Sequence, residues 1–240
     1  RDPSVSVIFD VSGGDLTNGI LPYLDFRAFS AYPKLIFGYS DVTALLNAVY
    51  QMTGVPSVLY SVKNLIGKDA DIQIKRFSSF LHEASNMLFS PEWSFVQGEK
   101  MTGVLIGGNI RCLLKLAGTP YFPAYEDAVL LLESRSGDEN RIRAYFDQLL
   151  CMGVFSKVSG VLLGTFTELE RICGEDAPQR LLRSVVRDSS LTIAKTQTVG
   201  HGSDSYALPI GMFVSLCADG EKAVRLQFAH HSDYDIIPLH

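Results

Sequence analysis

The segment at residues 33–45 constrains the fold of this chain more than any other. An apolar run at 35–37 is typical of a short buried strand, and it ends at Gly38. An amphipathic helix follows at once, with apolar side chains at helical spacing: Val42, Leu45, Ala48 and Val49. The pattern predicts a strand, a tight corner and a helix, which is the repeating unit of a parallel α/β sheet.

Ser40 stands on that corner. A serine between a strand and a helix exposes its hydroxyl above the positive end of the helix, which suits a nucleophile whose reaction develops an oxyanion. The alternative is that Ser40 caps the helix, as serines often do. Val42 occupies the place of the second glycine in the G-x-S-x-G pattern. The local pattern alone therefore favours the cap.

Length and charge limit the classes of protein that this chain can belong to. Its 240 residues are enough for one large domain or two small ones. The net charge of −5 argues against nucleic acid or an anionic membrane as a partner, and no apolar run approaches the roughly 20 residues of a membrane span. The four scattered cysteines lack metal-ligand spacing and are typical of reduced thiols in a cytoplasmic protein.

Strand and helix patterns divide the chain into three parts. Residues 1–62 read as a βαβαβ unit with strands at 5–11, 35–37 and 57–60 and a helix at 41–53. Residues 63–98 surround one amphipathic helix, and we expect a connector there. Residues 99–240 contain expected strands at 103–109, 128–132, 160–163 and 223–228 and helices at 110–116, 138–152 and 178–188. The sequence thus predicts two α/β domains, the first with a parallel sheet.

Two residues in the second domain could act with Ser40. Glu133 follows an apolar strand, at the end where sites in α/β sheets gather; the alternative, weighed equally, is a solvated acid paired with Arg135. His201 lies between two glycines, which let the backbone hold an imidazole in an unusual position, although a loop histidine is more often polar surface. Spacing alone does not show that these segments meet.

Ser40, Glu133 and His201 could have complementary roles in nucleophilic catalysis. A serine needs an imidazole to take its proton, and a buried carboxylate fixes that imidazole. Ser40, His201 and Glu133 supply these groups. An oxyanion needs backbone N–H donors, and the candidates are Asp41, directly after the nucleophile, and Gly14.

Three more residues are candidates for substrate binding: Gly13, Asn109 and Arg111. Gly13 shares the glycine turn with Gly14. Arg111 follows Asn109 closely and could hold a terminal carboxylate, although an arginine on a helix surface is the more frequent situation. Trp93 and Tyr121 are the aromatic side chains nearest these segments that could stack on a nucleobase, and both could equally belong to the core.

An ordered series of motifs spans nearly the whole chain. It comprises segments 13–14, 21–25, 33–34, 38–45, 107–109, 116–121, 130–133, 153–155, 200–202 and 208–211. In this order the motifs resemble the LD-carboxypeptidase family of serine peptidases, which also contains the microcin C immunity hydrolases. The resemblance implies a Ser-Glu-His triad on Ser40, Glu133 and His201, two domains with the site at their junction, and a homodimer.

Two departures from the family matter. The family has a further strand–helix–strand portion ahead of Asp2, so we expect the N-terminal, flavodoxin-like domain to be incomplete at its start and the chain to be part of a longer protein. The family's acid is commonly followed by Asp or Glu, whereas Ser134 follows Glu133 here.

The resemblance also implies a substrate. The immunity hydrolases carry a longer Trp-bearing loop between the domains, implied to stack on a nucleobase, whereas the connector here is short and holds only Trp93. This favours release of terminal D-Ala from the murein tetrapeptide in cytoplasmic peptidoglycan recycling, with no metal or cofactor. The alternatives are hydrolysis of a peptidyl nucleotide and an inactive remnant that binds peptide.

Overall fold

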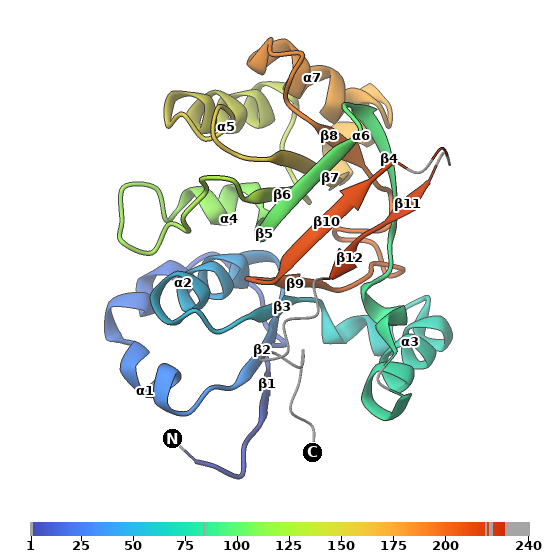
Figure 1. Ribbon diagram of the computed structural model, residues 1–240. Helices are drawn as coiled ribbons and strands as arrows, with labels where there is room; N and C mark the ends of the chain where they lie inside the picture. The colour runs from blue at the N-terminus through green and yellow to red at the C-terminus, as the bar shows by residue number, and fades with distance from the viewer. Residues whose placement is uncertain (1, 84, 219, 221–222, 229–240) are drawn as a thin grey trace.

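The computed structural model describes residues 2–83, 85–218, 220 and 223–228, and it contains two β-sheets with helices packed around them (Figure 1). The smaller sheet has the order β1 (Val7–Phe9), β2 (Leu35–Gly38), β3 (Ser57–Leu59) and β9 (Leu208–Ile210). The first three strands are parallel, and β9 is antiparallel to β3. The predicted parallel sheet of the N-terminal part is confirmed.

Among the described residues, the larger sheet has eight strands, with a parallel centre and antiparallel edges. Its strands, in spatial order, are β11 (Val224–Arg225), β4 (Glu92–Gln97), β8 (Ile193–Lys195), β7 (Gly160–Phe166), β6 (Val129–Ser134), β5 (Lys100–Asn109), β10 (Phe213–Cys217) and β12 (Gln227–Phe228). Strands β5 to β8 run parallel to one another. Because β5 and β6 are aligned with Asn109 opposite Glu133, both side chains stand at the carboxyl end of the sheet.

Helices cover both sheets. They are α1 (Phe26–Ala31), α2 (Thr43–Thr53), α3 (Ala70–Glu83), α4 (Ile110–Leu114), α5 (Glu139–Cys151), α6 (Thr167–Cys173) and α7 (Ala177–Val186). In the part of the chain that the structure describes, four short 3₁₀ helices lie between them, at Thr17–Tyr23, Ser40–Val42, Val62–Ile66 and Asn86–Phe89. Helices α4, α5 and α7 lie together over one face of the large sheet, and apolar side chains such as Phe146 and Leu182 form a core there (Figure 1).

A second apolar core joins the two sheets. Leu46 and Val49 of α2 and Leu208 of β9 pack in one cluster with Leu105 and Leu131 of the large sheet. Burial of leucine and valine side chains stabilises a fold by about 1.5–3 kcal/mol each. The relative position of the two sheets is therefore set by an apolar interface.

The structure departs from the expected three-part division in two places. Residues 92–97, placed in the connector, form β4, which pairs with β8 of the large sheet. Residues 208–210, placed in the second domain, form β9 of the small sheet. Strand β9 has only three residues, and polar and charged residues take up half of β4, so neither has an apolar repeat long enough to reveal it. The boundaries at residues 62 and 98 stay a prediction.

Candidate active site

Ser40 opens the 3₁₀ helix Ser40–Val42, at the corner between β2 and α2. Its φ of 56° lies in the left-handed region, which a non-glycine residue rarely adopts. The corner is tight, because a Cβ on Gly38 would lie 2.3 Å from Cγ1 of Val42. The Ser40 hydroxyl does not cap the helix but faces His201, with 3.3 Å between Ser40 Oγ and His201 Nε2.

His201 and Glu133 form the next contact. His201 Nδ1 lies 2.7 Å from Glu133 Oε2, so the carboxylate can fix the imidazole tautomer that presents Nε2 to the serine. Glu133 is 0% exposed, which rules out the solvated acid. Gly200 has a φ of 145°, and a Cβ there would lie 2.0 Å from Thr165 Oγ1. Only glycine therefore fits directly before His201.

Asn109 and Tyr39 surround this pair. Asn109 Nδ2 donates to Glu133 Oε1 at 3.0 Å, which satisfies the second oxygen of the buried carboxylate. The Tyr39 ring packs on the His201 ring with centroids 4.5 Å apart. Burial, followed by the charge of Glu133, raises the pKa of the Tyr39 phenol well above its ordinary value, while Arg135 acts in the opposite direction. Sequence reasoning missed the contact of Tyr39 with His201.

The glycine turn lies beside Ser40. A Cβ on Gly13 would lie 4.0 Å from Ser40 Cβ, and both Gly13 and Gly14 line the same cavity as Ser40. The Gly13 N–H donates to Asp10 Oδ1 at 3.2 Å, so it already has a hydrogen-bond acceptor within the protein. The N–H of Asp41 lies in the first turn of a helix, where N–H groups have no intrahelical partner.

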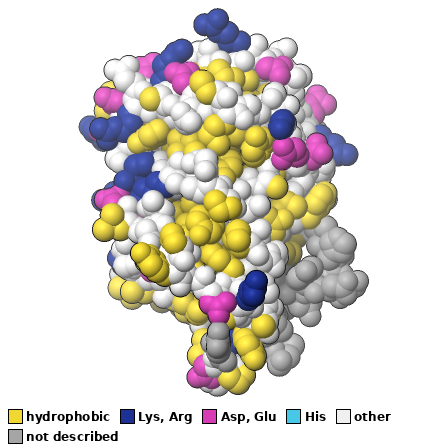
Figure 2. All heavy atoms as spheres, turned by 90° about the vertical axis from the view of Figure 1, so that its left-hand side faces the viewer, with side chains coloured by type: hydrophobic (Ala, Val, Ile, Leu, Met, Phe, Trp, Pro, Cys, Tyr) yellow, Lys and Arg dark blue, Asp and Glu magenta, His cyan; other side chains and the backbone are white. Residues whose placement is uncertain are grey.

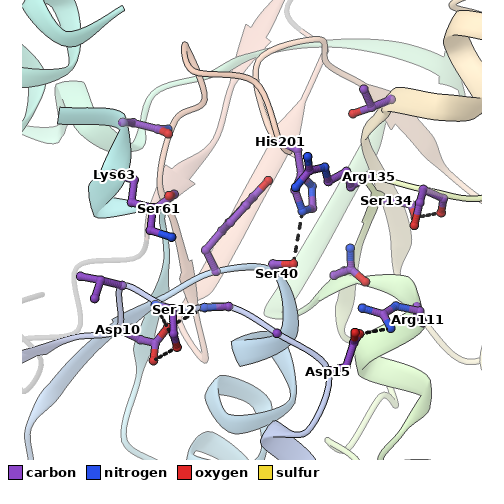
Figure 3. Close-up of a pocket in the computed structure, with 18 of the residues that line it drawn as sticks. Asp10, Ser12, Asp15, Ser40, Ser61, Lys63, Arg111, Ser134, Arg135 and His201 are labelled. Atoms are coloured by element: carbon purple, nitrogen blue, oxygen red, sulfur yellow. Dashed lines mark hydrogen bonds and ion pairs between the residues drawn. The ribbon is translucent and has the colours of Figure 1, made fainter. Parts of the chain in front are cut away.

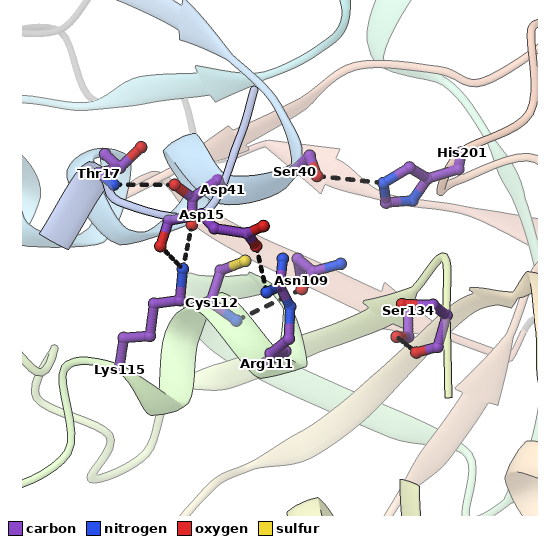
Figure 4. Close-up of polar contacts among 11 residues, drawn as sticks. Asp15, Thr17, Ser40, Asp41, Asn109, Arg111, Cys112, Lys115, Ser134 and His201 are labelled. Carbon is purple, nitrogen blue, oxygen red and sulfur yellow. Dashed lines mark hydrogen bonds and ion pairs between the residues drawn. The ribbon is translucent and has the colours of Figure 1, made fainter. Parts of the chain in front are cut away.

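The Asp41 side chain, which sequence reasoning did not consider, joins three parts of the chain (Figure 4). Its carboxylate accepts from the Thr17 N–H at 2.8 Å and from Lys115 Nζ at 2.5 Å. Lys115 Nζ also donates to the Asp15 carbonyl oxygen at 2.6 Å. Burial raises the pKa of Asp41, but the hydrogen bonds from Lys115 and Thr17 outweigh it and hold the pKa below its ordinary value.

Arg111 is a half-exposed side chain at the start of α4, and its guanidinium forms an ion pair with Asp15 (Figure 4). The pair spans the cavity edge, from the loop that carries the glycine turn to α4. The positive charge of Arg111 in the cavity is therefore already balanced by the Asp15 carboxylate.

One cavity of about 680 Å³ is lined by Ser40, His201, Tyr39, Asn109, Arg111 and the glycine turn (Figure 3). Its walls come from segments 10–15, 39–40, 61–64, 109–111, 134–136 and 201–202, and from Thr167. Trp93 lies in the core with 0% exposure, and Tyr121 packs on Phe26 with ring centroids 5.7 Å apart. Tyr39 is the one aromatic side chain lining the cavity in the described part of the chain.

Residues of the expected connector hold the loop that carries His201. Gln73 of α3 is fully buried, and its Nε2 donates to the carbonyl oxygens of Ser203 and Ser205 at 2.8 and 2.9 Å. Arg76 Nη1 donates to the Asp204 carbonyl oxygen at 2.8 Å. No sequence signal could have revealed these contacts, because they join positions about 130 residues apart.

Two further findings concern the described residues as a whole. None of the helices that the structure describes is long and apolar enough to cross a membrane. Within the same residues, no three side chains of His, Cys, Asp or Glu are grouped where they could hold a metal ion.

Comparison with known proteins gives matches along the whole chain. The N-terminal domain of LD-carboxypeptidase matches residues 1–60, and the C-terminal domain of LD-carboxypeptidase matches residues 102–216. The putative carboxypeptidase YocD of Bacillus subtilis is 30% identical over 237 residues, which cover 88% of this chain and 72% of YocD. The probable murein peptide carboxypeptidase of the same organism is 27% identical over 93% of this chain and 72% of its own.

The microcin C7 self-immunity protein MccF of Escherichia coli is also a relative, 26% identical over 92% of this chain and 74% of its own. A solved structure of MccF in the wild-type apo state has a TM-score of 0.82 and covers 94% of this chain and 77% of that chain, at 23% identity. This likeness confirms the two-sheet α/β fold. Together, the two matched domains and the identity to YocD show that the chain belongs to the LD-carboxypeptidase family of serine-type hydrolases.

Proposed function

We propose that this protein hydrolyses an amide bond in a small peptide, with Ser40 as nucleophile, His201 as general base and acid, and Glu133 as the carboxylate that orients His201. One observation carries the proposal: the contacts Ser40 Oγ–His201 Nε2 at 3.3 Å and His201 Nδ1–Glu133 Oε2 at 2.7 Å lie at a cavity wall. A distance of 3.3 Å is ordinary for a free enzyme, because such bonds tighten when substrate binds.

The chemistry follows from these positions. Ser40 Oγ attacks the scissile carbonyl carbon while His201 Nε2 takes the hydroxyl proton, and the N–H groups of Asp41 and Gly14 stabilise the oxyanion. His201 then gives the proton to the leaving nitrogen, and the C–N bond breaks to leave an ester on Ser40. Water, deprotonated by His201, hydrolyses that ester and restores the serine.

The favoured substrate is the murein tetrapeptide, cut between the L-centre of its third residue and the terminal D-Ala. Family membership and the murein peptide carboxypeptidase of B. subtilis support this substrate. Base stacking on an aromatic side chain contributes about 1–3 kcal/mol to nucleotide binding. Trp93 and Tyr121 do not line the cavity, and Tyr39, which does, packs its ring against His201. The described residues therefore favour the peptide over a peptidyl nucleotide.

One assay with two substrates tests this function. The same preparation is given a murein tetrapeptide and an aminoacyl sulfamoyl adenylate, with Ser40→Ala as the control for contaminating activity. We expect D-Ala release with no cleavage of the nucleotide, unchanged after EDTA treatment. The reverse pattern would favour the immunity-type reaction. A loss with EDTA that zinc restores would contradict a metal-free mechanism, and cleavage of neither substrate would favour a peptide-binding remnant.

We further propose that the protein is a cytoplasmic homodimer that takes part in peptidoglycan recycling, as the family resemblance implies. Apolar side chains gather on the face that Figure 2 shows, with charged side chains around them. Clustered exposed apolar surface is typical of interaction sites. Light scattering on the purified protein should give twice the monomer mass; a monomer at micromolar concentration would contradict the dimer.

A further inference from the structure

Three cationic side chains line the cavity: Lys63, Arg111 and Arg135. Arg111 is paired with Asp15. Within the described residues, neither Lys63 nor Arg135 forms an ion pair. The Asp10 carboxylate, also in the cavity, already accepts from the Ser12 N–H and hydroxyl and from the Gly13 N–H. Two cations in the site are therefore left for an anionic substrate.

The backbone that carries Arg135 is held firmly in place. The Arg135 carbonyl oxygen accepts from the Glu168 N–H at 3.1 Å, and the Gly137 N–H donates to Glu168 Oε2 at 2.6 Å. Ser134 Oγ donates to the Ser136 carbonyl oxygen at 2.8 Å, which closes the turn from inside. An arginine on such a braced loop loses less freedom when its planar guanidinium binds a carboxylate through two hydrogen bonds.

Arg135 lies on the side of the cavity that carries His201 (Figure 3). Tyr39, whose ring packs on His201, lines the same cavity as Arg135. His201 must protonate the leaving nitrogen, so the leaving residue lies on this same side. In an amino acid one carbon separates the nitrogen from the carboxyl group, which brings the terminal carboxylate to Arg135.

Lys63 belongs to the opposite wall. It stands on the 3₁₀ helix Val62–Ile66, and Figure 3 shows it beyond Ser40 from Arg135, on the side of Ser61 and Asp10. A group bound there belongs to the acyl part of the substrate, which stays on Ser40 after the leaving residue departs. An ammonium on a long chain supplies charge at this position without a fixed geometry.

We propose that Arg135 binds the terminal carboxylate of the leaving residue and that Lys63 binds a carboxylate on the acyl side. The substrate class is then a peptide with carboxylates on both sides of the scissile amide. This inference rests on the proposed function, because it takes the direction of the substrate from attack by Ser40 and proton donation by His201. The sequence made Arg111 a candidate for the terminal carboxylate, but Arg111 is paired with Asp15. The inference assigns this role to Arg135 instead.

Calorimetric binding to a Ser40→Ala background tests the inference, since binding is then measured without turnover. The probes are the murein tetrapeptide and the same peptide with a C-terminal carboxamide. We expect Arg135→Gln to raise the Kd of the free acid by about tenfold or more, as loss of a hydrogen bond between charged groups does. The Kd of the carboxamide should not change, and Arg135→Lys should restore part of the affinity for the acid.

A second pair of probes tests Lys63. The tetrapeptide is compared with a version whose acyl-side carboxylates are amidated, and Lys63→Gln should weaken only the unmodified form. The matched control is Arg143→Gln, which removes one positive charge from the exposed surface of α5 and should change neither Kd.

Three results would overturn the inference. In the first, Arg135→Gln raises the Kd of the free acid and of the carboxamide equally. In the second, the Ser40→Ala protein binds the free acid and the carboxamide with the same Kd. In the third, it binds neither peptide. D-Ala release by the wild-type chain is measured separately. Release without carboxylate-dependent binding at Arg135 refutes this inference alone, whereas carboxylate-dependent binding without release refutes the proposed hydrolysis and leaves the two cationic positions as a binding site.

Discussion

At Ser40 the chain adopts a backbone conformation with a φ of 56° that costs a non-glycine residue about 1–3 kcal/mol. In this conformation the Ser40 hydroxyl faces His201. Ser40, Glu133 and His201 could all be singled out from the sequence, because each stands at the end of a recognisable strand or between two glycines. The contacts of Asn109 and Tyr39 with Glu133 and His201 could not, since nothing in their local sequence reveals a partner from another strand or loop.

Asn109 gives a prediction at the residue scale. Its amide donates to Glu133 and its Oδ1 accepts from the Cys112 N–H at 3.3 Å, so both polar atoms are already used within the protein. We expect Asn109→Ala to lower kcat by about 10–100-fold, the effect of one hydrogen bond to a charged group, with KM nearly unchanged. Steady-state kinetics on the tetrapeptide measure both constants, with Asn140→Ala on exposed α5 as the control. A rise in KM at constant kcat would instead make Asn109 a substrate-binding residue.

Between elements, contacts distant in sequence complete the site. The carboxylate of Asp41 joins the 3₁₀ helix after β2 to the loop before Thr17 and to the end of α4, through Lys115, 74 residues away. The sequence predicted only the backbone role of Asp41, because an ion pair over that separation leaves no local pattern. The long, strongly apolar strands and helices were predicted well. The three-residue strands β8 and β9 were not, because their apolar runs are too short to be distinguished from loop.

The pH dependence of stability tests the Asp41 contacts. The folded-state pKa of Asp41 lies below the unfolded value of about 3.9, so the carboxylate stabilises the fold above that pH, and the stabilisation is lost as pH falls through the folded-state pKa. We expect Asp41→Asn to lower the free energy of unfolding by about 1–3 kcal/mol at pH 7. The difference from wild type should shrink as the pH is lowered below about 4.

Urea unfolding between pH 3 and pH 7 measures this difference. Asp147→Asn, which removes a half-exposed carboxylate from a surface pair with Arg143, is the control and should change stability by less than about 1 kcal/mol at every pH. A difference for Asp41→Asn that stays constant or grows toward acid would show that the ion pair does not stabilise the folded protein.

Across the whole molecule, the two sheets depend on one another. Asn47 of α2 is fully buried, and its amide exchanges hydrogen bonds with the Gly107 backbone of β5: Nδ2 donates to the carbonyl oxygen at 2.9 Å and Oδ1 accepts from the N–H at 2.8 Å. Along the chain, strand β9 joins the small sheet between β8 and β10, which both belong to the large sheet. Ser40 belongs to the small-sheet side and Glu133 to the large sheet, so their meeting depends on this interface.

Removing the Asn47 amide should destabilise both sheets together. Asn47→Ala leaves two buried backbone groups of Gly107 without partners, at about 1–3 kcal/mol for each group. Trp93, the only tryptophan, reports on the large sheet by fluorescence, and far-UV circular dichroism reports on the whole chain. We expect both signals to shift to the same lower urea midpoint, with Asn140→Ala near wild type. Separate midpoints for the two signals would mean that the sheets unfold independently.

The turnover number of three variants on the murein tetrapeptide tests the central claim most directly. We expect Ser40→Ala and His201→Ala to lower kcat by about 10⁴-fold or more, and Glu133→Gln by less, because nucleophile and base act as one unit. Circular dichroism should show the folded state in each variant, and Ser156→Ala, an exposed serine outside the cavity, should keep wild-type kcat. A Ser40→Ala protein that releases D-Ala at nearly the wild-type rate would contradict the serine mechanism.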